Sequence, residues 1–370
     1  MRILQLSSAR TLGGGERHVA DLCDGLARRG HEVYAALRPG SPLAAELKDI
    51  PAGRIFTLPL RNALDLPGAL RLARLARDTR AEIIHAHLAR DYTLAAFAAR
   101  RAKGARLVVT RHVMFPLGRA HRIFLKDVSS AVAVSEAVAR SLRAQRIFPA
   151  DRIRVVHNGV AVERFKAVSE SLDREDYRRR LGLGAGLIVG TLGELSEVKG
   201  QEDFVRATAL MAREIEGIEF LIVGADASRA GENRARLESL IAELGLGGRV
   251  RLLGRREDVA ELLACLDVFV SPSRTEAFGL AIVEAMASGT AVVATATDGA
   301  REVVEDGATG LLVPPRDPSA LASAVVTLLR DAPLRARLVE AAQRCARERW
   351  SLERMVAETE QVYKAVGSRQ

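Results

Sequence analysis

Two glutamates, Glu276 and Glu284, stand eight residues apart where the sequence turns from a loop into a helix-forming segment. A helix start exposes unpaired backbone N–H groups and the positive end of the helix macrodipole, so Phe278, Gly279 and Leu280 are expected to form an anion site. Carboxylates beside such a site can accept hydrogen bonds from sugar hydroxyls. The pattern favours a ligand with phosphates at one end and hydroxyls at both sides. A pair of solvated surface charges is the alternative explanation of the same spacing.

This stretch resembles the E-x7-E element of the retaining glycosyltransferases of family 4. In that family the second glutamate holds the ribose of the nucleotide, and the first lies at the donor sugar near the reacting carbon. The resemblance implies that Glu284 binds the donor ribose and that Glu276 has a catalytic role. It also implies that Phe278, Gly279 and Leu280 bind the donor.

A glycine-rich loop, T-L-G-G-G-E-R-H, follows the first apolar run and precedes a helix-forming segment. It does not match the dinucleotide-binding fingerprint, because His18 occupies the third glycine position and Arg38, rather than an acid, follows the next strand. A nicotinamide enzyme is therefore not expected. In family 4 a similar Gly-Gly-x-Glu element closes over the reaction centre, which implies donor contacts for Gly14 and Gly15 and a sugar or acceptor contact for Glu16.

Histidines lie where two predicted strands end, at His85 and His87 in I-I-H-A-H and at His112 in V-V-T-R-H. Ligands bind at the carboxyl ends of strands in open α/β sheets. The first pair can equally be one core and one surface histidine, and no third ligand at metal spacing supports a zinc site. His112 resembles the family histidine that contacts the transferred sugar or phosphate, which implies a catalytic role. His87 and Arg111 are assigned to the acceptor or sugar side.

The segment G-E-L-S-E-V-K-G places Lys199 before a helix, where the family uses a lysine to bind the diphosphate. The family usually has an arginine where this chain has Glu194. A carboxylate about 4 Å from a phosphate oxygen would be repelled by about 4 kcal/mol at an effective dielectric of about 20. Glu194 could turn away, Arg274 could bind the phosphate, or the donor could bind differently. We expect that Lys199 and the backbone of 278–280 suffice.

Length and composition indicate a globular protein of two domains: 370 residues, 48% apolar and 27% charged. The three cysteines, Cys23, Cys265 and Cys345, are far apart and have no metal-ligand spacing, so we expect reduced core residues of a cytoplasmic protein. The first residues read as a strand rather than a signal peptide, and no apolar run is long enough to span a bilayer.

The positive charge is concentrated in the first half, where residues 1–180 carry 33 Lys+Arg and 18 Asp+Glu, a net charge of +15. Arginines at 71, 74, 77 and 80 share a predicted helix with leucines, and residues 115–126 mix basic and apolar side chains. A solvated basic face is one explanation, and docking on the anionic inner face of a membrane is the one we prefer. With 4% aromatic residues there are few stacking platforms, so nucleic acid is not the expected partner.

Short apolar runs alternate with amphipathic segments, which is typical of parallel α/β units. The expected strands cover residues 3–6, 33–37, 83–84, 107–109, 131–134, 153–156, 187–189, 220–223, 250–253, 268–270, 291–294 and 311–313. The interdomain linker is expected from residue 155 through the charge-rich 166–180. The resemblance implies the GT-B fold, with two doubly wound Rossmann-like domains facing across a cleft. Their predicted extents are 1–167 with a returning helix at 350–370, and 168–349.

The resemblance covers nearly the whole chain and implies a retaining glycosyltransferase that uses a nucleotide-diphosphate sugar of the UDP or GDP type. The implied acceptor is a lipid-linked or polysaccharide glycan of the cell envelope, as in lipopolysaccharide, capsule or exopolysaccharide synthesis. No Asp-x-Asp motif occurs, so neither a metal nor another cofactor is expected. A UDP-sugar 2-epimerase of the same fold and a non-catalytic sugar-nucleotide binding protein are the alternatives.

Overall fold

The chain forms two compact units, one made of Met1–Gly159 with the chain from Leu352 onward, and the other of Val160–Ser351. The computed structural model describes residues 1–118 and 120–368; Arg119, in the predicted basic segment, lies outside them. The predicted domain boundary at 167/168 falls inside helix α6 (Val162–Ser171), whereas the two units divide just before this helix. Among the helices of these residues, none has the length and apolar character that crossing a bilayer requires.

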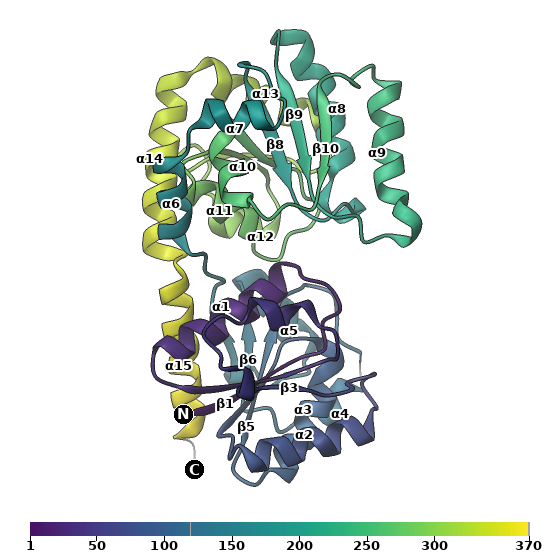
Figure 1. Ribbon diagram of the computed structural model, residues 1–370, viewed down its shortest axis with the longest axis vertical. Coiled ribbons are helices and arrows are strands. Elements are labelled where there is room, and N and C mark those ends of the chain that lie inside the picture. The colour runs from purple at the N-terminus through teal and green to yellow at the C-terminus, as the bar shows by residue number, and fades with distance from the viewer. Residues whose placement is uncertain (119, 369–370) are drawn as a thin grey trace. The chain divides into compact units, whose positions relative to one another are not determined.

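The first unit is built on a seven-stranded sheet with the order β3-β2-β1-β4-β5-β6-β7, and all neighbouring strands are parallel (Figure 1). Its strands are β1 (Arg2–Ser7), β2 (Glu32–Leu37), β3 (Ile55–Thr57), β4 (Ile83–Ala86), β5 (Arg106–Arg111), β6 (Ser130–Ala133) and β7 (Ile153–Val155). The order reverses between β1 and β4, so this sheet has the topological switch point at which α/β proteins bind ligands.

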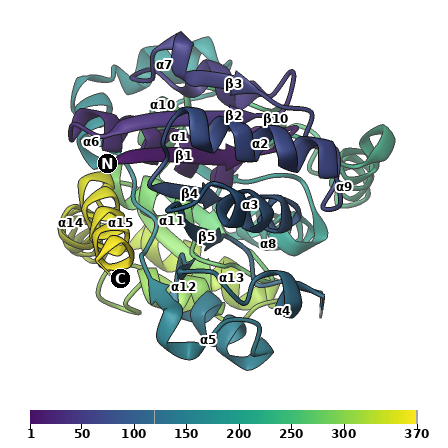
Figure 2. The same cartoon turned by 90° about the horizontal axis from the view of Figure 1, so that it is seen from below.

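Helices cover this sheet, and right-handed crossovers place α1 on one face and α2 and α3 on the other (Figure 2). The helices are α1 (Gly14–Arg28), α2 (Leu66–Asp78), α3 (Ala89–Arg101), α4 (His121–Phe124), α5 (Glu136–Gln145) and α15 (Leu352–Gly367). Helix α1 buries Leu22, Cys23 and Leu26. It packs so closely on α15 that a Cβ added at Gly25 would lie 2.5 Å from Val356 Cγ2. The expectation that the C-terminal helix packs on the first domain is confirmed.

The second unit has a six-stranded parallel sheet with the order β10-β9-β8-β11-β12-β13. Its strands are β8 (Ile188–Leu192), β9 (Glu219–Val223), β10 (Val250–Gly254), β11 (Val268–Ser271), β12 (Ala291–Thr295) and β13 (Leu311–Val313). Its other helices are α7 (Arg174–Arg180), α8 (Gln201–Glu214), α9 (Glu232–Glu243), α10 (Val259–Cys265), α11 (Leu280–Ala287), α12 (Asp298–Val303), α13 (Pro318–Arg330) and α14 (Ala332–Arg349). This sheet also reverses its order, between β8 and β11, so its switch point lies where β11 leads into α11.

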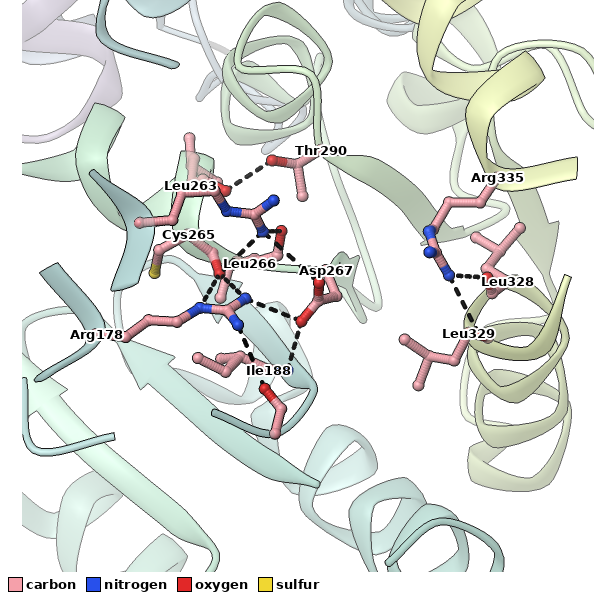
Figure 3. A network of polar contacts seen from close by, with 12 residues as sticks. Arg178, Ile188, Leu263, Cys265, Leu266, Asp267, Thr290, Leu328, Leu329 and Arg335 are labelled. Carbon is pink, nitrogen blue, oxygen red and sulfur yellow. Dashed lines mark hydrogen bonds and ion pairs between the residues drawn. The ribbon is translucent and has the colours of Figure 1, made fainter. Parts of the chain in front are cut away.

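The charge-rich segment 166–180, predicted as a linker, is instead folded into α6 and α7. Arg178 on α7 donates to the carbonyl of Cys265 and to Asp267 Oδ2 at 3.0 Å, and the same Asp267 oxygen accepts from the Ile188 amide at 2.8 Å (Figure 3). These bonds attach α7 to the ends of β8 and α10. The prediction of a linker from the high density of charges was wrong, because the partly buried partner, Asp267, is distant in sequence.

Candidate functional site

In the first unit the side chains of interest gather at the carboxyl ends of β1, β4 and β5. His87 follows β4, His112 follows β5, and His18 reaches them from the second turn of α1. The rings of His18 and His112 make an edge contact with centroids 4.7 Å apart, and those of His87 and His112 stack at 5.7 Å. The structure therefore brings together two predicted histidines and adds His18, which no assignment from sequence included.

These histidines are bound to one another and to the strands by hydrogen bonds. His87 Nε2 lies 2.8 Å from Gln5 Oε1, and His112 Nε2 lies 3.4 Å from His87 Nδ1. His85 bridges Tyr363 Oη at 2.6 Å and Thr110 Oγ1 at 2.7 Å. The alternative in which one histidine of the 85/87 pair lies on the surface is wrong, because both are buried.

Burial keeps the cluster uncharged. It lowers the pKa of His18 from its ordinary 6.5 to about 4. It lowers the pKa values of His85, His87 and His112 well below 6.5, and the neighbouring histidines add to the effect. An imidazolium is costly when it is removed from water and placed beside another basic group. At neutral pH these residues therefore act through neutral donor and acceptor nitrogens.

A third imidazole accompanies His87 and His112 after all, since ligand atoms of His18, His87 and His112 all lie within 4.8 Å of one another. Neutral imidazoles are ligands for zinc and related metals. Here, however, His112 Nε2 and His87 Nδ1 are within hydrogen-bonding distance of each other, and that contact already uses one lone pair. The absence of a metal stays a prediction.

The glycine loop meets the histidine cluster at Gly15, where an added Cβ would lie 3.7 Å from His112 Cγ. Gly14 is the first residue of α1 and is exposed. Glu16 Oε2 accepts from the Gly13 amide at 3.0 Å, so it caps α1 in addition to any contact with a sugar. Arg111 is buried, and its Nη2 donates to the carbonyl of Phe115. Arg111 thus anchors the loop after β5.

In the second unit the two predicted donor-side groups are in direct contact. Lys199 Nζ lies 2.6 Å from Glu276 Oε2, which is also 3.3 Å from Ser273 Oγ. The other oxygen, Oε1, lies 3.2 Å from the Ala277 amide. The Glu276 side chain is 14% exposed and that of Lys199 33% exposed. Glu276 is therefore held in place by three donors, and Lys199 is its only cation among the ion pairs of the described chain.

A helix begins at Leu280, as predicted, and Gly279 is its N-cap residue. Gly279 has φ of +100°, a left-handed conformation that favours glycine, and an added Cβ would lie 2.9 Å from Ile282 Cδ1. The Phe278 side chain is buried and contacts the Trp350 ring at 5.4 Å, so only its backbone can serve a ligand. Leu280 opens the helix, and Glu284 lies half-buried one turn further along.

The structure bears on the unexpected Glu194. Its side chain is exposed, and its carbonyl accepts from Gln201 Nε2 at 3.0 Å, which fixes the loop. Arg274, the alternative cation, donates to Asp203 Oδ2 at 3.0 Å and Oδ1 at 3.1 Å and to Glu197 Oε1 at 2.9 Å. Because Arg274 is bound to two carboxylates, the structure favours the explanation in which Glu194 points into solvent.

Sequence comparison finds a family model in each unit. Residues 12–164 match the model described as "Glycosyltransferase Family 4", and residues 173–344 match "Glycosyl transferases group 1". The lipopolysaccharide core biosynthesis glycosyltransferase LpsE of Rhizobium meliloti (strain 1021) is 30% identical over 89% of each chain. The chain belongs to glycosyltransferase family 4. The alpha-D-kanosaminyltransferase of Streptomyces kanamyceticus is also 30% identical, over 67% of this chain and 63% of its own length, so that the match spans less than two thirds of that relative.

Structural comparison places this family member in the GT-B fold, as expected from the sequence. HepE from Anabaena, solved in complex with UDP and glucose, superposes with a TM-score of 0.89 and 25% identity. The match covers 99% of this chain and 100% of that chain. Both units and the C-terminal helix are therefore part of one shared architecture.

Proposed function

We propose that this family 4 protein is a retaining, metal-independent glycosyltransferase that moves a sugar from a nucleotide-diphosphate sugar to a cell-envelope glycan or glycolipid. The observation that carries the proposal is the contact between Glu276 and Lys199 beside the start of α11. A carboxylate for sugar hydroxyls, a cation for phosphate and a helix start for an anion occur together at one loop. UDP and glucose bound to HepE support a donor of this class.

Donor binding would proceed by exchange of an ion pair. In α11 the Ile282 and Val283 amides donate to the Gly279 carbonyl, so an anion would meet the amides that precede them at this helix start, where the macrodipole adds positive potential. A diphosphate bound there would attract Lys199, which now contacts Glu276 at 2.6 Å. As Lys199 turns toward the phosphates, the Glu276 carboxylate becomes available to the sugar. Glu284, one turn into the helix, is proposed to bind the ribose.

The chemical step in this proposal is attack by an acceptor hydroxyl on the same face of the sugar that the diphosphate leaves. Lys199 and the α11 amides would stabilise the charge that develops on the leaving diphosphate. The acceptor proton passes to a leaving phosphate oxygen, so no protein base is required. Neutral His112 would contact the sugar, and Arg111 and Glu16 are assigned to the sugar or acceptor side. His87, predicted for the same side, has both ring nitrogens bonded and would act through His112.

We also propose that the first unit docks on an anionic membrane. Its most exposed large apolar side chains are Leu64 (80%), Ile123 (71%) and Phe115 (65%), and they lie in the segments just before α2 and around α4. Both segments are tied to α3, because Thr93 Oγ1 donates to the Ala63 carbonyl and Arg100 Nη2 to that of Phe124. Exposed arginines on α2 would add attraction to acidic lipids.

Product analysis tests the catalytic proposal. The protein would be incubated with UDP-glucose or GDP-mannose, with and without a lipid-linked or oligosaccharide acceptor, in EDTA. We expect release of the nucleotide diphosphate and a product with the anomeric configuration of the donor, read by NMR. Inverted product would contradict retention, a 2-epimer formed without acceptor would indicate an epimerase, and tight nucleotide binding without turnover would indicate a binding protein.

Vesicle flotation tests the membrane proposal. We expect the protein to float with phosphatidylglycerol vesicles, to stay in solution with phosphatidylcholine vesicles, and to dissociate at high salt. Phe115→Ser with Ile123→Ser should weaken flotation. The matched control is Val198→Ser, which removes an apolar side chain of 40% exposure from the second unit. Equal flotation of both variants, or no preference for acidic lipid, would contradict the proposal.

A further inference from the structure

A buried chain of polar side chains runs from the C-terminal helix to His112. Tyr363 on α15 is fully buried, and its Oη lies 3.2 Å from Gln5 Nε2 on β1. The other end of the Gln5 amide, Oε1, lies 2.8 Å from His87 Nε2, and His87 Nδ1 lies 3.4 Å from His112 Nε2. All four residues belong to the first unit. Tyr363 is thus joined to His112, the histidine proposed to meet the sugar, through Gln5, which is 358 positions away in sequence, and His87.

The geometry determines which residue donates and which accepts in each of these hydrogen bonds. Gln5 Oε1 can only accept, so His87 carries its proton on Nε2. Neutral His87 then has a lone pair on Nδ1, which accepts from His112 Nε2–H. At the other end, Gln5 Nε2–H donates to Tyr363 Oη, whose own proton goes to His85 Nδ1 at 2.6 Å. Each hydrogen bond of this arrangement then joins one donor to one acceptor.

We propose that Gln5 and Tyr363 are positioning residues that hold His112 in the Nε2–H tautomer, so that its Nδ1 is a hydrogen-bond acceptor. Among residues 1–118 and 120–368, His112 Nδ1 has no hydrogen-bond partner although it is buried. Its described neighbours include Gly15, which has no side chain, and the His18 ring, whose own Nδ1 is likewise buried without a hydrogen-bond partner. A buried acceptor without a donor is unfavourable, and a sugar hydroxyl would satisfy it. A bare phosphate oxygen would not, because it also only accepts.

The reverse assignment of donors and acceptors has a defined chemical consequence as well. If the Gln5 amide were rotated by half a turn, Nε2–H would donate to His87 Nε2, and the proton of His87 would move to Nδ1. His112 would then accept at Nε2 and carry its proton on Nδ1. It would present a donor suited to a phosphate oxygen instead of an acceptor suited to a hydroxyl. The orientation of one buried amide therefore decides which part of the substrate His112 can bind.

Nitrogen NMR of the protein with ¹⁵N-labelled imidazoles reads the tautomer without any substrate. The chain has seven histidines, and the His112 signals are those lost in His112→Asn. We expect protonated Nε2 and bare Nδ1 on His112 at pH 7. Gln5→Met and Tyr363→Phe should each give a mixture of tautomers on His87 and His112. The matched control is Tyr92→Phe. It removes a buried hydroxyl that donates to the Thr110 carbonyl and takes no part in the bonds between Tyr363, Gln5, His87 and His112, so it should leave the signals unchanged.

A proton on His112 Nδ1 in the wild-type protein, or unchanged tautomers in both Gln5→Met and Tyr363→Phe, would overturn the proposal. Its catalytic part rests on the proposed glycosyl transfer. There we expect Gln5→Met to lower kcat about tenfold with a change in donor KM of about twofold or less, while Tyr92→Phe stays near wild type. An effect on KM alone, or an equal loss in Tyr92→Phe, would indicate a merely structural role. If the wild type transferred no sugar, the proposed function would fail while the tautomer measurement still stood.

Discussion

Removal of the Lys199 ammonium group tests the proposed exchange of ion pairs. Lys199→Met keeps an unbranched side chain along Gly193 but removes the charge. The packing there is close, since a Cβ added at Gly193 would lie 3.5 Å from Lys199 Cδ. Two unit charges about 4 Å apart attract by about 4 kcal/mol at a dielectric of about 20. Lys199 is 33% exposed and must first leave Glu276, so we expect about half of this value. A loss of about 2 kcal/mol raises the Kd for UDP about thirtyfold.

Isothermal titration calorimetry with UDP measures this effect directly. Glu276→Gln is the matched control, because it keeps the shape of the partner and leaves Lys199 free for phosphate. It should bind UDP at least as tightly as wild type while losing sugar transfer. In Lys199→Met with Glu276→Gln, UDP affinity should remain weak although no unpaired carboxylate is left. A Kd for Lys199→Met within twofold of wild type would refute the exchange, and a restored affinity in the double variant would show that only the unpaired Glu276 charge mattered.

Three further predictions concern stability. Gly299→Ala places a Cβ 2.6 Å from the Glu276 carbonyl oxygen and from the Phe278 amide nitrogen. The second unit should lose about 2 kcal/mol of stability and melt about 4–8 °C lower in calorimetry. An unchanged melting temperature would be inconsistent with this packing. Hydrogen bonds with lysine, arginine and histidine lower the pKa of Glu360 to about 2, so the stability that Glu360 contributes is present above about pH 4.5 and is lost as the pH falls toward 2. Glu360→Gln should therefore reduce the dependence of the unfolding free energy on pH in that window. An unchanged dependence would contradict this. In the folded protein His18 is neutral, with a pKa lowered to about 4, so the unfolded chain binds more protons between about pH 6.5 and 4. Stability therefore falls as the pH drops through that range. In urea titrations at several pH values, His18→Gln should reduce this dependence of stability on pH, and an equal dependence would exclude His18 as its source.

Most of the strands could be predicted because each is a short apolar run followed by an amphipathic segment. The exception is β3 (Ile55–Thr57), which pairs with β2 alone at Ala35, Ala36 and Leu37. Three residues are too few to show a period, and this strand is recognisable only from its partner. The basic helix was also predicted too long, since α2 ends at Asp78 and Arg80 lies beyond it with φ of +49°.

The candidate site was predictable where the backbone itself defines it. The conformation of Gly279 and the start of α11 follow from local sequence, because a glycine before an apolar helix-forming run is a local signal. The contact of Lys199 with Glu276 is not local, since 77 residues separate them. His18 was missed although a signal existed: it stands four residues before Leu22 and eight before Leu26, on the buried face of α1.

The charge balance of the second unit explains how the site can tolerate Glu194. Arg274 is neutralised by Asp203 and Glu197, and Lys199 by Glu276, so these candidate cations are paired before a donor binds. The start of α11 is positive without a permanent charge and needs no counter-ion of its own. A diphosphate would therefore be attracted first to the backbone, and it would recruit Lys199 only when it is close enough to compete with Glu276. An exposed Glu194 carboxylate, screened by water, opposes this sequence of events far less than a buried one would. In the proposed function, the same order would make the Glu276 carboxylate available to the sugar only after the diphosphate has bound, so that a free sugar would not compete for it.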